Sequence, residues 1–191
     1  ARLAMNRYDK DSCSCFKLDY REDEYDVGDV LLDKKMHKAI AIMQFKLEGQ
    51  MILRHPEFKM QDRLLLDKIN PEKGVVMIDG QEYELRDIHY PTVDWEHPYE
   101  LSPDERDVMD RLKTAFINCE KLQKHIRFLL TKGSMYNVYN GNLLYHGCVP
   151  LNEDGTFTEV EIYGKKYSGK ALYDVLENYA RKGYYSINPE E

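Results

Sequence analysis

A histidine at the end of an apolar run is the residue of this sequence best placed to do chemistry. In "YNGNLLYHGC" (139–148), residues 143–145 are apolar and lead to His146, which a glycine and a cysteine follow. A neutral imidazole on a rigid strand is a good metal ligand, and Gly147 leaves its approach open. The alternative is a core histidine satisfied by hydrogen bonds. Spacing alone favours that alternative, because one histidine does not make a site.

Other ligand types are present but lack the spacing of a known site. Cys13 and Cys15 form a C-x-C pair that could bind a soft metal, yet no second Cys or His pair stands at zinc-site spacing. Cys119 and Cys148 fall in periodic segments that we expect to be buried. This cysteine usage predicts no disulfide framework and favours a reducing cytoplasm. His89 and His97 lie in a proline-rich loop over residues 89–101, where surface histidines are the simpler interpretation.

Composition and charge exclude several classes of function. The chain has 191 residues, 42% hydrophobic and 32% charged, and no apolar stretch approaches the roughly 20 residues that span a bilayer. We therefore expect a globular chain with no membrane partner. The net charge is −7, and acids cluster in "DYREDEYD" (19–26). No basic stretch is long enough to follow a phosphate backbone, so nucleic acid is not an expected partner.

Hydrophobic periodicity predicts long amphipathic helices after a polar N-terminal segment. Residues 1–32 show no sustained period, and we expect an extended or weakly ordered acidic connector there. A helix should begin at Asp33, be weakened by Gly49 and end at His55-Pro56. A second helix should begin at Ser102 with a capping box and run unbroken to Gly133. Its apolar residues recur every three or four positions and include Cys119, which we place in the core.

Three β-hairpins complete the predicted elements. Asp79-Gly80 within residues 75–85 and Asn140-Gly141 in the opening segment are pairs that tolerate positive φ in a two-residue turn. The strand that returns to His146 has apolar residues on both faces, so we expect it to be central and buried. A third hairpin should turn near Gly164-Lys165, and a closing helix over residues 169–181 should bury Leu172, Val175, Leu176 and Tyr179. The fold class is mixed α/β (α+β).

The motif around His146 resembles a known family. "GNLLYHGCVPLNEDGTF" (141–157), "KMHKAIAIMQFKLEGQMI", "MQDRLLLDKI", the first hairpin and "EKLQKHIRFLLTKGSMYNVYNGNLLYHGC" are similar to the class III fructose-1,6-bisphosphatases of bacteria, calcineurin-like metallophosphoesterases. The apolar strand followed by His-Gly also resembles the protein serine/threonine phosphatases. The resemblance implies that His146 is a ligand of one ion in a two-metal centre, most plausibly Mn²⁺, and that Gly147 is a spacer. It assigns no catalytic residue in this chain, and it leaves the sugar-binding residues open.

The other motifs of that superfamily are absent from the 191 residues. The sequence contains no Asp-x-His strand, no Gly-Asp-x-x-Asp-Arg-Gly loop, no Gly-Asn-His turn and no late Gly-His-Thr-Pro. We therefore expect a middle fragment of a longer enzyme, with residues 1–32 as connector and residues 33–191 as the central part of a metallophosphoesterase domain. A chain that has lost its site is the alternative. The isolated chain should be inactive.

The function implied by the resemblance belongs to the parent protein. That protein should hydrolyse fructose 1,6-bisphosphate to fructose 6-phosphate and phosphate, a gluconeogenic step, with a water activated by two metal ions. Two alternatives stay open. A related phosphoprotein phosphatase would keep the same histidine and metals, and a non-catalytic interaction module would use the long second helix as its partner surface.

Overall fold

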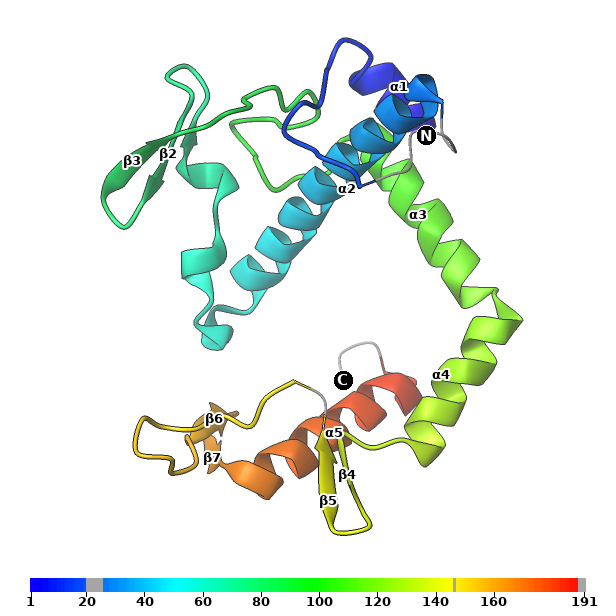
Figure 1. Ribbon diagram of the computed structural model, residues 1–191, viewed down its shortest axis with the longest axis vertical. Coiled ribbons are helices and arrows are strands. Elements are labelled where there is room, and N and C mark those ends of the chain that lie inside the picture. Colours follow the sequence, from blue (N-terminus) through cyan, green and yellow to red (C-terminus); the bar gives the residue numbers. More distant parts are fainter. Residues whose placement is uncertain (20–25, 146, 189–191) are drawn as a thin grey trace. The chain divides into compact units, whose positions relative to one another are not determined.

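The computed structural model describes residues 1–19, 26–145 and 147–188, and the chain forms two compact units, Ala1–Thr114 and Ala115–Glu191. The described residues form five α-helices and three small antiparallel sheets (Figure 1), which confirms the mixed α/β class. The calcineurin-like arrangement stays a prediction, as does the division into a connector and a metallophosphoesterase domain.

The start of the chain is helical, so the expectation of an extended or weakly ordered structure is wrong for its first residues. Helix α1 (Arg2–Arg7) leads to Tyr8, whose side chain is fully buried. Tyr8 packs in one cluster with Ala39 and Ile42 of the following long helix, and Leu3 lies against the same cluster. The segment has too few residues for a visible period, and its burial against another element determines its structure. Residues 20–25, which carry most of the acidic run, lie outside the described part of the chain.

The long helix α2 spans Val27–Arg54 and begins six residues before the predicted start at Asp33. Asp26 is the N-cap, because its side chain accepts a hydrogen bond from the Gly28 N–H at 2.7 Å. The helix ends at His55-Pro56, as predicted. Gly49 does not interrupt it: the Tyr99 ring lies 2.0 Å from the position that a Cβ would take, so the glycine provides space for close packing.

The segment after α2 contains three short 3₁₀ turns, η1 (Pro56–Phe58), η2 (Gln61–Arg63) and η3 (Leu66–Lys68). Strands β1 (Ile69–Asn70), β2 (Val75–Ile78) and β3 (Gln81–Glu84) then form an antiparallel sheet. The β2–β3 hairpin turns at Asp79-Gly80 with positive φ at both residues, as predicted. One core cluster of the unit combines residues of α2, of the segment after it and of a later loop: Ile52, Leu64, Leu66 and Tyr99.

Helix α3 (Pro103–Ile117) begins with the predicted capping box. The Ser102 N–H donates to Glu105 Oε2 at 2.7 Å, and the Glu105 N–H donates to the Ser102 hydroxyl at 3.3 Å. The prediction of one unbroken helix is wrong, because the backbone at Cys119 is extended and a new helix, α4 (Glu120–Lys132), starts after it. Asn118 and Cys119 are weak helix formers. Cys119 is the exposed N-cap of α4 and not a core residue.

The second unit holds the hairpin that leads to His146. Strands β4 (Tyr136–Tyr139) and β5 (Asn142–Tyr145) pair antiparallel and turn at Asn140-Gly141, as predicted. The prediction that the returning strand is central and buried is wrong: β4 and β5 form a two-stranded sheet, and every residue of β5 is exposed. The apolar faces of a strand become buried only when further elements cover them, and in the described part of the chain no third strand joins this sheet. Cys148 is exposed as well, contrary to prediction.

The chain continues with a third hairpin and the last helix. Strands β6 (Val160–Ile162) and β7 (Lys165–Tyr167) turn at Tyr163-Gly164, one residue before the predicted pair. Helix α5 (Gly169–Tyr185) starts where predicted and ends four residues later than predicted. Leu172 is buried in it, but Leu176 and Tyr179 are exposed, so the predicted burial of those two is wrong. Tyr173, next to Leu172, is buried instead.

Candidate functional site

The predicted metal ligand, His146, lies outside the described residues, so its role stays a prediction. The residues on either side of it are described. Strand β5 ends at Tyr145, and Gly147 follows with φ +84°, a conformation that favours glycine. A Cβ at Gly147 would meet no atom of this chain within 4 Å. The position therefore needs glycine for its backbone conformation, and the space around it is open.

Tyrosine side chains surround the two ends of this segment. The Tyr173 hydroxyl donates a hydrogen bond to the backbone carbonyl of Cys148 at 3.1 Å. The Tyr173 ring lies 6.0 Å from the Tyr136 ring and 6.5 Å from the Tyr145 ring, between centroids. Lys170 adds a cation–π contact, with its Nζ 5.6 Å from the Tyr136 centroid. Helix α5 thus contacts both strands of the hairpin and the chain beyond His146.

The described residues do not assemble a metal centre by themselves. No group of three His, Cys, Asp or Glu side chains in the described ranges could hold a metal ion. Cys13 is buried while Cys15 is exposed, and burial raises the pKa of the Cys13 thiol to about 11. A thiol that resists deprotonation is a poor metal ligand, which argues against the C-x-C site. A complete two-metal centre would need donors from outside the described part of this chain.

The loop histidines have local partners, as expected for surface residues. His89 Nδ1 lies 2.9 Å from Asp11 Oδ2, and His97 Nδ1 lies 3.7 Å from Asp94 Oδ2. Both imidazoles are more than half exposed. Neither belongs to a three-ligand cluster within the described residues.

Sequence reasoning missed a buried charge cluster centred on Lys38. Lys38 Nζ donates to Asp11 and, at 2.7 Å, to Asp87 Oδ2, and it lies over the rings of Tyr8 and Tyr90. Burial raises the pKa of Asp11, but the hydrogen bonds from Lys38 and His89 lower it by more. The pKa of this carboxyl group therefore lies well below its usual range. The cluster ties the N-terminal segment to α2 and to the chain after β3.

A second buried pair lies two turns along the same helix. Lys46 Nζ donates to Glu105 Oε2 at 2.8 Å and to the Thr92 carbonyl at 2.6 Å, and both charged side chains are fully buried. The Tyr8 and Thr92 hydroxyls are 3.3 Å apart, and burial raises the pKa of Tyr8 to about 12. Glu105 Oε1 has no hydrogen-bond partner among the described residues. The carboxylates of Asp11 and Glu105 are each paired with a lysine. Such pairs connect distant segments of the chain and do not leave the carboxylates available to a metal ion.

A sequence signal for these pairs existed. Lys35, Lys38 and Lys46 follow the three- and four-residue spacing of the buried apolar residues of α2. A lysine at a buried helix position needs an anionic or carbonyl partner, so the spacing alone could have predicted buried ion pairs. It could not have named the partners, because Asp11, Asp87 and Glu105 are far away in the sequence.

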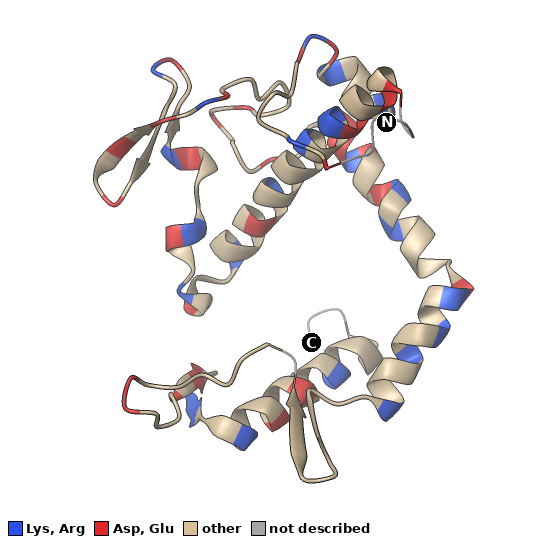
Figure 2. Ribbon diagram, viewed as in Figure 1, with Lys and Arg blue, Asp and Glu red and all other residues tan. Residues whose placement is uncertain are grey.

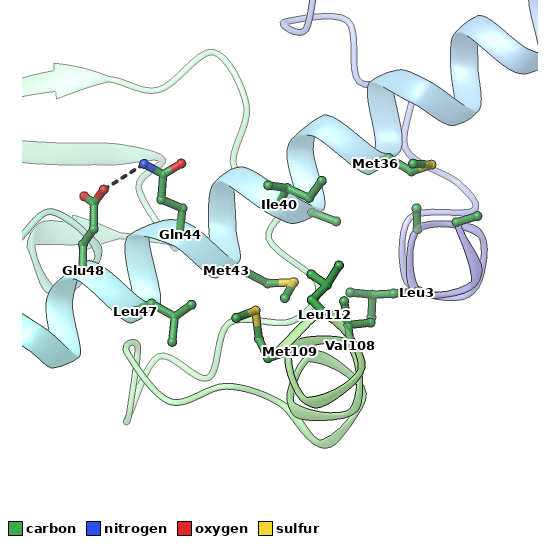
Figure 3. A pocket seen from close by; sticks show the side chains of 13 residues that line it. Leu3, Met36, Ile40, Met43, Gln44, Leu47, Glu48, Val108, Met109 and Leu112 are labelled. Carbon is green, nitrogen blue, oxygen red and sulfur yellow. Dashed lines mark hydrogen bonds between the residues drawn. The ribbon is translucent and has the colours of Figure 1, made fainter. Parts of the chain in front are cut away.

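An apolar groove of about 410 Å³ lies in the first unit among α1, α2 and α3 (Figure 3). Three methionines contribute to its lining, namely Met36, Met43 and Met109. Gln44 and Glu48 are the polar side chains of the lining, and the Gln44 amide donates to Glu48 Oε1 at 2.8 Å. Among the residues that the structure describes, no lysine or arginine lines the groove. A phosphorylated sugar needs several convergent polar and cationic groups, so this groove does not suit such a ligand.

Comparisons with known proteins agree with the motif around His146. The family described as "Firmicute fructose-1,6-bisphosphatase" matches residues 1–191. The chain is 54% identical over 188 residues to the "Fructose-1,6-bisphosphatase class 3" of Clostridium novyi (strain NT), covering 98% of this chain and 28% of that protein. The protein of the same name from Clostridium acetobutylicum is 52% identical over 186 residues, covering 97% of this chain and 28% of that protein.

The chain thus spans less than a third of the length of the curated relatives that it matches. No solved structure matches it. Among the described helices, none has the length and apolar character needed to cross a membrane. The match over all 191 residues, at about half identity to its relatives, is decisive for classification: the chain belongs to the Firmicute fructose-1,6-bisphosphatase family.

Proposed function

We propose that the complete protein containing this chain hydrolyses the 1-phosphate of fructose 1,6-bisphosphate, giving fructose 6-phosphate and phosphate in gluconeogenesis. The single observation that supports this most strongly is the family match over residues 1–191, with relatives that are named class 3 fructose-1,6-bisphosphatases. Those relatives are more than three times as long as the chain. The activity is therefore proposed for the complete protein, and the 191 residues alone should not turn over substrate.

The same proposal gives His146 the role of a metal ligand and Mn²⁺ the role of cofactor. Two divalent ions in a calcineurin-like fold would polarise the phosphoryl oxygens and activate a water molecule. Within this chain, the contribution is one imidazole between Tyr145 and Gly147, with the remaining donors supplied by the rest of the protein. Gly147 supports this assignment because its positive φ and open surroundings leave space beside the strand end.

A cytoplasmic location and a bisphosphate substrate belong to the same proposal. Four cysteines without a disulfide framework suit a reducing compartment. The names of the relatives favour the sugar bisphosphatase over the phosphoprotein phosphatase. The net charge of −7 is compatible with an anionic substrate, because bound cations would supply the local positive field.

The test is phosphate release by the purified complete protein in the presence of Mn²⁺. Three substrates should be compared at equal concentration: fructose 1,6-bisphosphate, fructose 6-phosphate and a phosphoserine peptide. We expect rapid release from the first and little from the other two. Faster release from the phosphopeptide would replace the proposal with a phosphoprotein phosphatase, and no release from any substrate would favour a non-catalytic module.

A further inference from the structure

The break between α3 and α4 lies in a segment whose sequence also fits one continuous helix. No proline or glycine occurs from residue 104 to residue 132, and the apolar residues keep their three- and four-residue spacing across the break. We infer that this segment is a conformational switch with two forms. In the broken form, α3 ends at Ile117 and α4 starts at Glu120 (Figure 1). In the continuous form, one helix runs from residue 103 to residue 132.

Burial does not hold the break in place. Every residue from position 111 to position 121 is exposed, including the large apolar side chains of Phe116 and Ile117. Sharp breaks in helices usually come from proline, from glycine or from a group inserted into the ladder of backbone hydrogen bonds. Because the segment contains neither proline nor glycine, an inserted group is the cause that is left.

The inserted group is the side-chain amide of Gln123. Its Nε2 donates to the Phe116 carbonyl at 3.0 Å, and the Cys119 N–H donates to the same oxygen at 3.4 Å. In a continuous α-helix, that carbonyl would accept from the N–H of residue 120, four positions further on. The Gln123 amide therefore occupies the acceptor that the continuous form needs.

The two forms should be close in free energy. The continuous form gains hydrogen bonds for the N–H groups of residues 120–122, which form the first turn of α4 and have no intrahelical acceptor there. The broken form keeps the Gln123 bond and leaves Asn118 and Cys119, two weak helix formers, outside both helices. These contributions oppose each other, and each is small because helix propagation in an exposed segment is nearly neutral per residue.

The position of the switch gives it a consequence for the chain. The two compact units divide between Thr114 and Ala115, within α3, and the break follows in the next few residues. In the continuous form, the helix that leaves the first unit runs on to Lys132, and its apolar residues form one long seam that suits packing against a partner helix. In the broken form, that seam is interrupted at Cys119.

The experiment compares Cys119→Ala with Cys119→Gly in the complete protein. Alanine favours the interior of a helix and is a poor N-cap, whereas glycine has the opposite preferences. Hydrogen exchange of the amides of residues 120–122, measured by mass spectrometry, reports on the continuous form, because that form gives these amides helical acceptors. We expect intermediate protection in the unmodified protein, a rise of about threefold to tenfold in Cys119→Ala, and a fall toward the rate of an unstructured peptide in Cys119→Gly.

Two further variants test the cause of the break. Gln123→Ala removes the bond to Phe116 and should also raise the protection of residues 120–122. The matched control Lys113→Ala, at an exposed position of α3, should leave it unchanged. Equal protection in Cys119→Ala and Cys119→Gly would overturn the inference: fast exchange in both would mean a fixed break, and slow exchange in both a fixed continuous helix. Exchange is read without any activity, so this result is independent of the proposed phosphatase function.

Discussion

The two compact units of this chain differ in how they are stabilised. In Ala1–Thr114, there are two apolar clusters and two buried lysines, Lys38 and Lys46, that are paired with carboxylates, and most of the buried side chains of the described chain lie here. In Ala115–Glu191, Leu172 and Tyr173 are the buried apolar side chains among the described residues, and the hairpins are exposed. The first unit thus has a hydrophobic core of its own. The second unit exposes apolar strand residues that further parts of the complete protein could cover.

The charges divide in the same way. Residues 1–114 contain 25 acidic and 18 basic side chains, whereas residues 115–191 contain nine of each. The whole net charge of −7 therefore falls on the first unit. Within the second unit, basic residues gather on α4, which carries Lys121, Lys124, Arg127 and Lys132 (Figure 2). The unit that contains the predicted metal ligand is thus the one without net negative charge.

The largest expected effect comes from breaking the buried pair of the first unit. Lys46→Met leaves the Glu105 carboxylate buried without its cation, and we expect a loss of about 3–5 kcal/mol in the free energy of unfolding. Urea denaturation followed by the fluorescence of Trp95, the single tryptophan, reports on this unit. Adding Glu105→Gln should recover much of the loss, because the buried negative charge is then removed as well.

The control for this experiment is an exposed pair in the same unit. Lys73 and Glu82 lie 3.8 Å apart with side chains at least half exposed, so Lys73→Ala should leave the urea midpoint unchanged. A loss for Lys46→Met no larger than that for Lys73→Ala would contradict the description of the first unit as cross-linked by buried charges.

A smaller effect should follow from core truncation in the second unit. Leu172→Ala should lower the stability of this unit by about 2–3 kcal/mol, because Leu172 is buried. Leu144→Ala should change it by less than about 0.5 kcal/mol, because Leu144 is 54% exposed. Native-state hydrogen exchange of the α5 amides measures both. Similar losses for the two variants would mean that β5 is covered within this chain after all.

Acid should weaken each unit through one carboxylate. Hydrogen bonds from the Ser134 hydroxyl and the Met135 N–H, together with Arg181, lower the pKa of Glu177 from 4.5 to about 2. A lowered pKa in the folded state stabilises the fold above pH 4.5, and this contribution is lost as the pH falls toward 2. Asp11 should act in the same direction in the first unit, starting below its ordinary value of 3.8.

The variant Glu177→Gln isolates that contribution. It should reduce stability by about 1 kcal/mol at pH 7 and flatten the pH dependence of the second unit between pH 4.5 and 2. Hydrogen exchange of the α5 amides is the readout, and exchange in the first unit is the internal control. An unaltered acid profile in Glu177→Gln would assign the pH dependence to other groups.

The smallest perturbation is chemical labelling of the cysteines. Cys15, Cys119 and Cys148 are exposed, whereas Cys13 is buried and burial raises the pKa of its thiol to about 11. At pH 8 we expect three thiols to react rapidly with a disulfide reagent and the fourth only when the first unit opens. Mass spectrometry of the labelled peptides identifies each thiol. Rapid labelling of Cys13 would show that the N-terminal segment is not packed as described.

Local signals predicted part of this fold well. The turns at Asp79-Gly80 and Asn140-Gly141 and the capping box at Ser102 depend on nearby residues, so the sequence contains all the necessary information. The break at Cys119 was missed, because the apolar spacing continues across it while the backbone does not. The burial of β5 was mispredicted because burial depends on what covers a strand, and the apolar pattern does not say whether that cover lies in the same chain.

The candidate site was predicted from a motif and not from geometry. His146 was selected by the pattern of an apolar strand followed by His-Gly and by the resemblance that this pattern carries. Tyr173 could not be selected in this way, since its partner Cys148 lies 25 residues away and the bond is to a backbone carbonyl. Every residue has a backbone carbonyl, so the type of the accepting residue does not indicate that such a bond will form.

The most direct test of this account is the phosphatase activity of His146→Ala in the complete protein at saturating Mn²⁺. The matched control is His97→Ala, which removes an exposed imidazole from the first unit. We expect phosphate release from fructose 1,6-bisphosphate to fall by about two orders of magnitude or more in His146→Ala, and to stay unchanged in His97→Ala. Near-normal release by His146→Ala at saturating Mn²⁺ would contradict the metal-ligand assignment and make His146 a structural residue.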